Sequence, residues 1–298
     1  MYASAFQTAK VSPPCGQQDR VPSPFKRQIT DTYNYGGIFM KTIAVITGAS
    51  KGIGKEFADR IAEYGKVDEV WAIARSADKL EALKESVPYP VRPIALDLSR
   101  EESFREYASL LREEKPFIKL LINCSGFGKF GAVTDVPTSE NLNMISLNCA
   151  ALTAITQESL PYMGKGSDVI QIASVAAYQP IPYIGVYGAT KAYVLSFSRA
   201  LNREVKGKGI HVMAVCPFWT KTEFFNRAIN KDDGKVIVKK YAAMYMPSQI
   251  VGKAYRDIKK KNKDVSMYGF VANAQTLATK ILPHKLIMSF WQSQQKLK

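Results

Sequence analysis

The sequence predicts an α/β protein with a single doubly wound domain around a central parallel sheet. Three features of the chain lead to this fold class. Short apolar runs alternate with longer stretches that repeat apolar residues every three or four positions, the spacing of a helix. The apolar runs are continuous, as in parallel strands that helices cover on both faces. A glycine-rich turn joins the first run to the first helical stretch.

The predicted elements follow one another in strand–helix order, which implies right-handed crossovers and a Rossmann-type sheet. Ligands of such a sheet bind outside the carboxyl ends of its strands. Strands are expected at Ile43–Thr47, Glu69–Ala74, Val91–Leu96, Leu120–Asn123, Val169–Ala173 and His211–Val215. Helices are expected near 53–64, 76–86, 100–114, 139–163 and 187–206. Ser76 and Ser99 are suited to cap two of these helices.

The turn after the first predicted strand reads Thr-Gly-Ala-Ser-Lys-Gly-Ile-Gly over residues 47–54. Glycines allow the backbone to approach a pyrophosphate closely, and a helix amino terminus offers free N–H groups to the anion. A strand before the turn and a helix after it are the context of a dinucleotide fingerprint, although the spacing differs from the common Gly-x-Gly-x-x-Gly. A glycine turn without a ligand is the structural alternative. The predicted cofactor residues here are Gly48, Ser50, Lys51, Gly52, Ile53 and Gly54.

A tyrosine and a lysine four residues apart, Tyr187 and Lys191, carry the predicted chemistry. Residues four apart share one face of a helix, so the ammonium can lie beside the phenol. A nearby positive charge lowers the pKa of a tyrosine and makes it a usable general acid or base. Ser174 lies thirteen residues upstream, after a predicted strand. Taken alone, the pair is more often ordinary helix surface.

Together these motifs resemble the short-chain dehydrogenase/reductase family over roughly Met40–Thr222. The matching segments occur in the family's order: Thr47–Gly54, Asp97-Leu98, Asn123–Gly126, Asn148, Ser174, Tyr187 with Lys191, and Pro217–Thr222. Two positions depart from the pattern. Asn-Cys-Ser-Gly stands where the family often has Asn-Asn-Ala-Gly, and Pro217-Phe218 stands where it often has Pro-Gly.

The resemblance implies a role for each catalytic candidate. Tyr187 would give a proton to the substrate oxygen during reduction, and Ser174 would hydrogen-bond the carbonyl. Lys191 would lower the pKa of Tyr187 and hold ribose hydroxyls, and Asn148 would hold water that links Lys191 to solvent. Hydride comes from the cofactor, while the protein orients the substrate and polarises its carbonyl. The other cofactor residues that the resemblance implies are Asp97, Asn123, Gly126, Pro217, Thr220 and Thr222.

The second predicted strand indicates which nicotinamide cofactor is bound. A dinucleotide fold usually places an acidic residue there to bind the ribose 2′-hydroxyl. Here Arg75 follows the strand instead, and Lys51 adds a second cation in the glycine turn. Because a guanidinium suits a phosphate, we expect NADP(H) rather than NAD(H). The alternative for Lys51 is an exposed loop lysine.

Aromatic and methionine residues after Pro217 suit a lipophilic ketone or alcohol better than a sugar. A hydroxysteroid or an acyl-type ketone is expected, and ordinary packing of a helical flap is the alternative. The predicted substrate residues are Phe127, Tyr178, Tyr183, Trp219 and Phe224.

Composition limits the remaining possibilities. Four cysteines without a C-x-x-C pair and only two histidines argue against a metal site, and buried free thiols suit the reducing cytoplasm. The net charge of +15 is concentrated from Lys231 onward, where fourteen Lys and Arg stand against four Asp. No nucleic-acid motif accompanies this charge. The dense basic patch at 256–263 is expected to be a solvated helix end, with contact to phosphate or an anionic membrane as the alternative. The apolar residues among lysines at 278–298 leave three alternatives open: an interfacial segment, closure of the substrate pocket, or packing on a neighbouring subunit.

Three segments are expected along the chain: a disordered leader at 1–39, a dinucleotide-binding and catalytic core at 40–222, and a substrate-covering flap with a basic helical tail at 223–298. The pair Gly36-Gly37 can be encoded by GGAGG shortly before the ATG of Met40, as in a bacterial ribosome-binding site. We therefore expect Met40 to be the first native residue.

The sequence thus favours an NADP(H)-dependent oxidoreductase that interconverts a carbonyl and an alcohol, and we expect a homo-oligomer. Two other functions stay open. One is an NADP(H)-binding regulator without turnover, which would need no proton donor such as Tyr187. The other is a membrane-associated scaffold, which rests on the basic tail alone.

Overall fold

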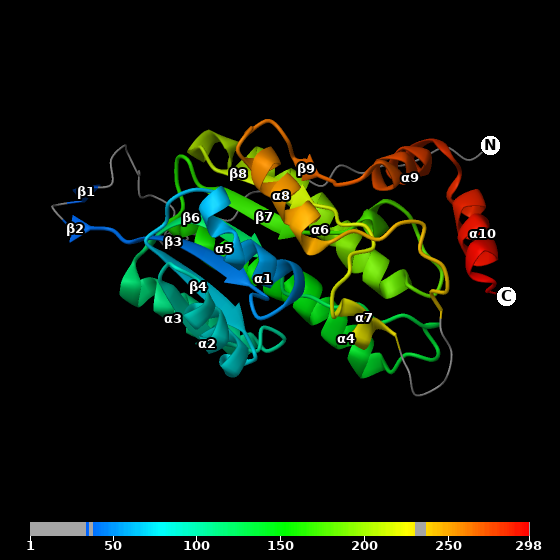
Figure 1. Cartoon of the computed structure of the whole chain (residues 1–298), viewed down its shortest axis with the longest axis horizontal. Coiled ribbons are helices and arrows are strands. Elements are labelled where there is room, and N and C mark those ends of the chain that lie inside the picture. Colours follow the sequence, from blue (N-terminus) through cyan, green and yellow to red (C-terminus); the bar gives the residue numbers. More distant parts are fainter. Residues whose placement is uncertain (1–33, 36–37, 230–236, 298) are drawn as a thin grey trace, which may run out of the picture. The chain divides into compact units, whose positions relative to one another are not determined.

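The structure is a computed structural model that describes residues 34–35, 38–229 and 237–297. Its main feature is a parallel sheet of seven strands in the order β5-β4-β3-β6-β7-β8-β9 (Figure 1). The strands are β3 (Thr42–Thr47), β4 (Glu69–Ala74), β5 (Val91–Ala95), β6 (Phe117–Asn123), β7 (Asp168–Ile172), β8 (His211–Val215) and β9 (Val265–Ser266). The predicted fold class is confirmed.

The strand order contains the switch point of a doubly wound sheet. From β3 the chain adds β4 and β5 on one side and then returns to place β6 on the other side of β3. In the pairing register, Thr47 lies opposite both Ile73 and Asn123, and Asn123 lies opposite Gln171. The central strands therefore end at one level, and ligands of doubly wound sheets bind beside such ends.

Helices cover both faces of the sheet, and the alternation of strand side chains explains why. Ala44 and Ile46 of β3 pack with α1 (Gly52–Asp59), α2 (Ala77–Ser86) and α8 (Pro247–Ile258). Ile43 and Val45 point the other way, into the core with α3 (Glu101–Glu114), α5 (Leu152–Ser159) and α6 (Gly185–Glu204). Successive side chains of a strand face opposite sides, so both faces of β3 are apolar.

The helix that the sequence predicts over 139–163 is interrupted. It consists of α4 (Thr138–Ile145), a π-helical turn η2 (Ser146–Ala151) and α5, followed by a 3₁₀ turn at Leu160–Tyr162. A π turn inserts one extra residue and often marks a functional site. Here the turn contains Asn148, whose side chain is 1% exposed.

The chain after β8 contributes α7 (Phe224–Ala228), α8, β9, α9 (Phe270–Ile281) and α10 (His284–Gln295). The seventh strand, β9, was not predicted, because two residues are too short for a sequence pattern. Among the described residues, no helix is both long and apolar enough to cross a membrane. The short antiparallel pair β1 (Asn34–Tyr35) and β2 (Ile38–Phe39) precedes the sheet.

The structure describes only part of the three segments predicted along the chain. Most of the expected leader, 1–39, lies outside the described residues, so the expectation for Met40 stays a prediction. The boundary between core and flap at residue 222 also stays a prediction. Because β9 pairs with β8 in the central sheet, the region after this boundary contributes to the sheet as well as to the cavity described below.

Candidate active site

The glycine turn packs tightly between the ends of β3 and β6. Gly48 has φ +70°, and a Cβ there would lie 3.0 Å from the backbone of Cys124. A Cβ on Gly54 would lie 2.2 Å from the carbonyl oxygen of Gly48, so the first turn of α1 sits directly against the loop. No side chain caps the amino terminus of α1. Its free N–H groups can therefore meet an anion.

The neighbouring strand end, that of β4, presents the cation expected from the sequence. Arg75 is exposed and lines the same cavity as the glycine turn, together with Lys51 and Lys79. Lys51 lies 3.4 Å from the carboxylate of Glu223, with both side chains about half exposed. Such a pair contributes little energy in water and leaves the lysine free to exchange partners.

Asp97 follows β5 and is held by its own turn. Its Oδ1 accepts hydrogen bonds from the backbone N–H of Ser99 at 3.1 Å and from the Ser99 hydroxyl at 2.7 Å. Burial opposes its ionisation, but these bonds and the charges of Arg75 and Arg100 outweigh burial, so the pKa of Asp97 lies below its usual value. Asp97 is therefore anionic at neutral pH and lines the cavity.

Asn148 joins the end of β6 to α6. Its Oδ1 accepts a hydrogen bond from the Phe127 N–H at 3.0 Å, and its Nδ2 donates to the Phe127 carbonyl at 2.9 Å and to Thr190 Oγ1 at 2.9 Å. Thr190 in turn donates to the Tyr187 carbonyl at 2.8 Å. A Cβ on Gly126 would lie 2.8 Å from Asn148 Oδ1 and 3.7 Å from Lys191 Nζ, so these two groups flank one small space.

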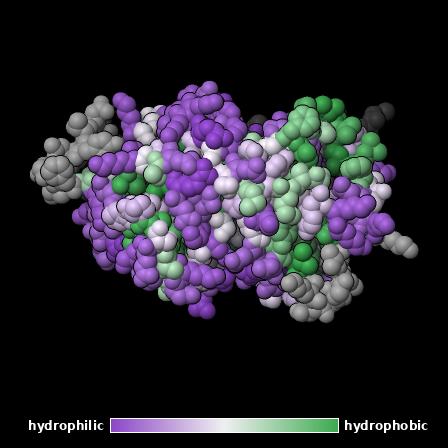
Figure 2. All heavy atoms as spheres, in the orientation of Figure 1, coloured by the Kyte–Doolittle hydropathy of each residue, from purple (hydrophilic) through white to green (hydrophobic). Residues whose placement is uncertain are grey.

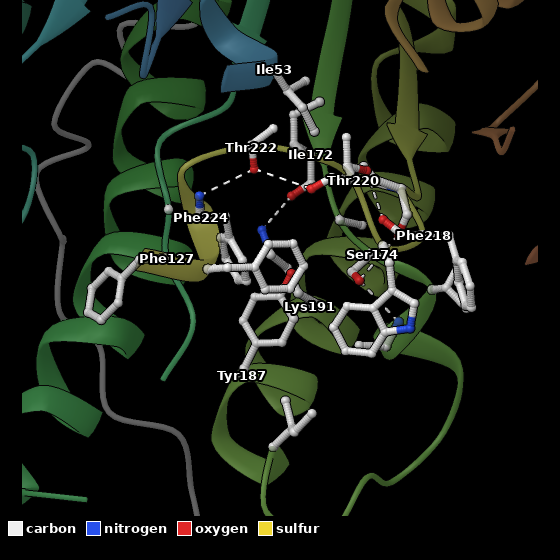
Figure 3. A pocket seen from close by; sticks show the side chains of 18 of the residues that line it. Ile53, Phe127, Ile172, Ser174, Tyr187, Lys191, Phe218, Thr220, Thr222 and Phe224 are labelled. Carbon is white, nitrogen blue, oxygen red and sulfur yellow. Dashed lines mark hydrogen bonds between the residues drawn. The ribbon is translucent and has the colours of Figure 1, made fainter. Parts of the chain in front are cut away.

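Three predicted catalytic residues, Ser174, Tyr187 and Lys191, meet in one cavity wall (Figure 3). Ser174 caps a short helical turn after β7, where its Oγ accepts a hydrogen bond from the Ala176 N–H at 3.1 Å. Lys191 Nζ lies 5.8 Å from the centre of the Tyr187 ring and donates to the Ile172 carbonyl at 2.7 Å. Asn148 is close to this group but does not line the cavity.

The protonation of the pair differs from the sequence expectation. Burial raises the pKa of Tyr187 to about 12, although a hydrogen bond with Ser174 opposes the shift. Burial also lowers the pKa of Lys191 to about 8. The expected net lowering of the Tyr187 pKa is therefore not seen, because burial is the largest influence on the phenol and the Lys191 ammonium donates to a backbone carbonyl. At neutral pH the phenol keeps its proton.

Buried thiols surround Lys191 without neutralising it. Burial raises the pKa of Cys124 and of Cys216 to about 12, and it also raises the pKa of Cys149. All three thiols stay protonated at neutral pH. No group of three or more His, Cys, Asp or Glu residues able to hold a metal occurs in the part of the chain that the structure describes.

One cavity of about 960 Å³ connects the glycine turn with the Ser174–Tyr187 wall and continues between apolar side chains. Phe130 makes ring contacts with Tyr187, Trp219 and Phe224. Trp219 lies 6.4 Å from the stacked ring of Trp291 on α10. One group of cavity residues that were not predicted comes from α9 and α10 and includes Phe270, Val271, Ala274, Leu286, Phe290 and Trp291. The apolar residues of this tail were noted in the sequence, but the pattern left open whether they face a membrane, a subunit or the pocket.

The other predicted cofactor residues of the cavity wall are Gly48, Ser50, Gly52, Ile53, Gly54, Gly126, Pro217, Thr220 and Thr222, and the predicted substrate residues in it are Phe127, Trp219 and Phe224. The backbone at Phe218 does not have a positive φ. A residue with a side chain therefore fits at this position, where the family often has glycine.

Besides Asn148, three predicted residues lie outside this cavity. The Asn123 side chain is buried and donates to Thr156 Oγ1 at 2.9 Å. Tyr178 ends the 3₁₀ turn Val175–Tyr178 and lines a smaller hollow beside Arg199. The next residue, Gln179, has an extended backbone with φ −152° and ψ 150°, and it lines the cavity instead. Tyr183 has φ +67° and also lies outside the cavity.

Comparison with known proteins agrees with this geometry. A family model described as short chain dehydrogenase matches residues 42–233. The chain therefore belongs to the short-chain dehydrogenase family, whose members are oxidoreductases acting on CH–OH groups.

Individual relatives span several substrates. A very-long-chain 3-oxoacyl-CoA reductase from Homo sapiens is 33% identical over 191 residues, which is 60% of this chain and 60% of the relative's length. A short-chain dehydrogenase from Sphingobium yanoikuyae, solved with NADPH, is 28% identical, with a TM-score of 0.68 over 83% of this chain and 95% of its own. A bulky-bulky ketone specific alcohol dehydrogenase from Comamonas testosteroni is 26% identical, with a TM-score of 0.63 over 82% of this chain and 95% of its own.

The residues present fit a nicotinamide dinucleotide. Gly48 and Gly54 let the turn pack closely against the end of β6 and the first turn of α1, the first turn of α1 has uncapped N–H groups, and cationic side chains line the adjoining wall. These features suit a pyrophosphate and its ribose substituents.

Replacing Gly54 by alanine tests the tight packing of the turn. The new Cβ would lie 2.2 Å from a backbone oxygen, so the loop or α1 must shift. We expect a loss of about 1–3 kcal/mol of stability, seen as a lower Tm, together with weaker dinucleotide binding. Gly185→Ala is the matched control, because nothing lies within 4 Å of its Cβ position. Equal Tm values for the two variants would contradict the packing argument.

Proposed function

We propose that this protein is an NADP(H)-dependent oxidoreductase that interconverts a lipophilic ketone or aldehyde and the corresponding alcohol. One observation carries the proposal. The hydroxyl-bearing residues Ser174 and Tyr187 lie with Lys191 in a single cavity wall, between the glycine turn on one side and an apolar chamber on the other. A carbonyl bound there is within reach of a protonated phenol.

The chain's own residues perform the polar part of the reaction. In reduction, the Tyr187 hydroxyl donates its proton to the substrate oxygen, and the Ser174 hydroxyl hydrogen-bonds that oxygen. The resulting phenolate is stabilised by the Lys191 ammonium, whose Nζ lies 5.8 Å from the centre of the Tyr187 ring. The nicotinamide, when bound, supplies hydride in this direction and accepts it in the reverse. Phe130 and Phe224 pack on the Tyr187 ring and restrict water.

An apolar cavity supports a lipophilic substrate. The chamber beyond Tyr187 is lined by aromatic side chains of α7, α9 and α10, and no carboxylate of the described chain other than Asp97 and Glu223 lines the cavity. The similarity to a very-long-chain 3-oxoacyl-CoA reductase and to a bulky ketone specific dehydrogenase supports the same conclusion. An acyl-type ketone or a hydroxysteroid fits these observations.

The cations beside the predicted ribose site support NADP(H). Arg75, Lys51 and Lys79 all line this part of the cavity, and no acidic residue follows β4 directly. A 2′-phosphate would meet positive charge there, whereas a carboxylate that would favour NAD(H) is missing. The NADPH-bound relative is consistent with this preference.

Tyr187→Phe removes the proton donor while keeping the ring. We expect kcat for ketone reduction to fall at least about a hundredfold, since general acid catalysis contributes roughly 10²–10⁴, whereas NADPH binding stays largely intact. Tyr193→Phe is the matched control on the same helix, because its hydroxyl contacts Thr153 and not the cavity. A near-normal kcat in Tyr187→Phe would overturn the proposed chemistry.

The pH profile of reduction is expected to report the charge state of the Lys191 ammonium. Its ammonium is retained below a pKa of about 8 and is lost as the pH rises through that value, while Tyr187 stays protonated up to about 12. We expect kcat/KM to be level near pH 7 and to fall above pH 8. In Lys191→Arg the positive charge persists to higher pH, so its residual activity should fall off less steeply. A wild-type rate that rises from pH 7 to 9 would contradict this account.

Arg75→Ala tests the cofactor preference. We expect KM for NADPH to rise by about tenfold or more, as for a lost charge-assisted contact, with little change for NADH. Arg105→Ala, an exposed arginine paired with Glu101 on α3, serves as the control. Equal effects of Arg75→Ala on the two cofactors would refute the assignment.

A further inference from the structure

The last two helices expose an unusual number of large apolar side chains. Half of the exposed large hydrophobic residues of the described chain lie between positions 270 and 290. They are Phe270 (86% exposed), Leu277 (60%), Ile281 (72%), Leu282 (47%), Leu286 (59%) and Phe290 (71%), and we call them the C-terminal apolar face. Figure 2 shows hydrophobic residues gathered over the region of α9 and α10. A contiguous exposed patch of this kind marks an interaction surface.

The face is held firmly by the opposite sides of the same helices. Trp291 is 8% exposed and donates from Nε1 to the Pro182 carbonyl at 3.1 Å. The Gln295 side chain is fully buried and bonds the backbone of Lys239 and Lys240. The inner side of α10 is therefore anchored to the body of the protein, and its outer residues form a fixed platform.

Four of these six residues lie at the rim of the active-site cavity. Phe270, Leu282, Leu286 and Phe290 are exposed and also line the cavity that contains Tyr187. The C-terminal apolar face thus surrounds an entrance to the proposed substrate chamber. A partner that binds this face would therefore lie next to the entrance of the proposed substrate chamber.

The charge around the face is of one sign. After Asp264 the sequence contains no Asp or Glu, whereas Lys280, Lys285, Lys296 and Lys298 follow. Every residue from Lys280 to Leu286, the turn between α9 and α10, is exposed. This turn therefore exposes Ile281, Leu282 and Leu286 together with Lys280 and Lys285, and we call it the tip.

We propose that the C-terminal apolar face docks on the surface of an anionic lipid bilayer, so that the cavity entrance opens onto the lipid. Large apolar side chains interleaved with lysines are the pattern of an interfacial segment, which inserts its apolar groups below the headgroups and pairs its cations with anionic lipid. A second copy of the chain fits less well, because a symmetric contact would bring the same lysines together.

Docking on a bilayer would also determine where the substrate comes from, an inference that rests on the proposed function. A lipophilic ketone is concentrated in a bilayer and passes from it into the chamber past the rim residues, without crossing water. The substrate class of the site is then a membrane-dissolved carbonyl compound. Each lysine near an anionic surface strengthens partitioning by about fivefold, so binding depends on salt and on lipid charge.

Vesicle flotation tests the docking without any turnover. The probes are vesicles of phosphatidylcholine alone and vesicles with one third phosphatidylglycerol, at low and at high salt. We expect the protein to float with the anionic vesicles at low salt and much less with the neutral ones. Ile281→Ser, at a tip position that does not line the cavity, should weaken partitioning by about tenfold. Lys285→Glu should weaken it by fivefold or more.

Leu142→Ser is the matched control, because Leu142 is 60% exposed on α4, away from the C-terminal apolar face. It should float like the wild type. Flotation of Ile281→Ser at the wild-type level, or failure of the wild type to float with anionic vesicles, overturns the proposal. A stable dimer in light scattering that Ile281→Ser dissociates would also overturn it, because a second copy would then cover the face.

The substrate route needs a separate measurement. The ratio of KM for a lipophilic ketone delivered in anionic vesicles to KM for a short water-soluble ketone should rise about tenfold in Ile281→Ser. An unchanged ratio in a variant that no longer floats refutes entry from the lipid. If neither ketone is reduced by the wild type, the proposed function fails, while the flotation result still decides the docking.

Discussion

The amide of Asn148 is the interaction on which the geometry of the site depends. It pairs with both backbone groups of Phe127 and donates to Thr190, which donates to the carbonyl of Tyr187. One side chain thereby fixes the segment after β6, the π turn and helix α6 relative to one another. A continuous α-helix would rotate this amide by the equivalent of one residue, so the π turn and the site belong together.

Burial decides the electrostatics of this arrangement. The ammonium of Lys191 and the phenol of Tyr187 are enclosed by the same walls, and enclosure disfavours the charged form of each. As a result, the Tyr187 phenol is protonated at neutral pH, and the neighbouring Lys191 has a pKa of about 8. Such a site is prepared to give a proton to a carbonyl. It holds the negative charge of the phenolate only while Lys191 is cationic.

The sequence predicted what depends on local patterns. Continuous apolar runs locate strands such as Glu69–Ala74, and the glycine turn could be recognised from its flanking strand and helix. The π turn was missed, because its cause is a tertiary hydrogen-bond network around Asn148. The aromatic ring of Tyr178 suggested a substrate contact, but the 3₁₀ turn that ends at Tyr178 leaves its neighbour Gln179 in the cavity wall. The pocket-lining role of α9 and α10 depends on packing between residues more than a hundred positions apart, such as Trp291 with Pro182.

The cavity, the glycine turn and the C-terminal apolar face together support the proposed hydride-transfer site, which opens beside an exposed apolar surface. Label transfer tests this central claim most directly. NADPH carrying deuterium at C4 of the nicotinamide, in either configuration, is incubated with the protein and a panel of steroid, acyl and aromatic ketones. Mass spectrometry of the alcohol product should show one deuterium on the former carbonyl carbon with one configuration and none with the other. Alcohol without deuterium from both configurations, or no alcohol from any ketone of the panel, would contradict the account.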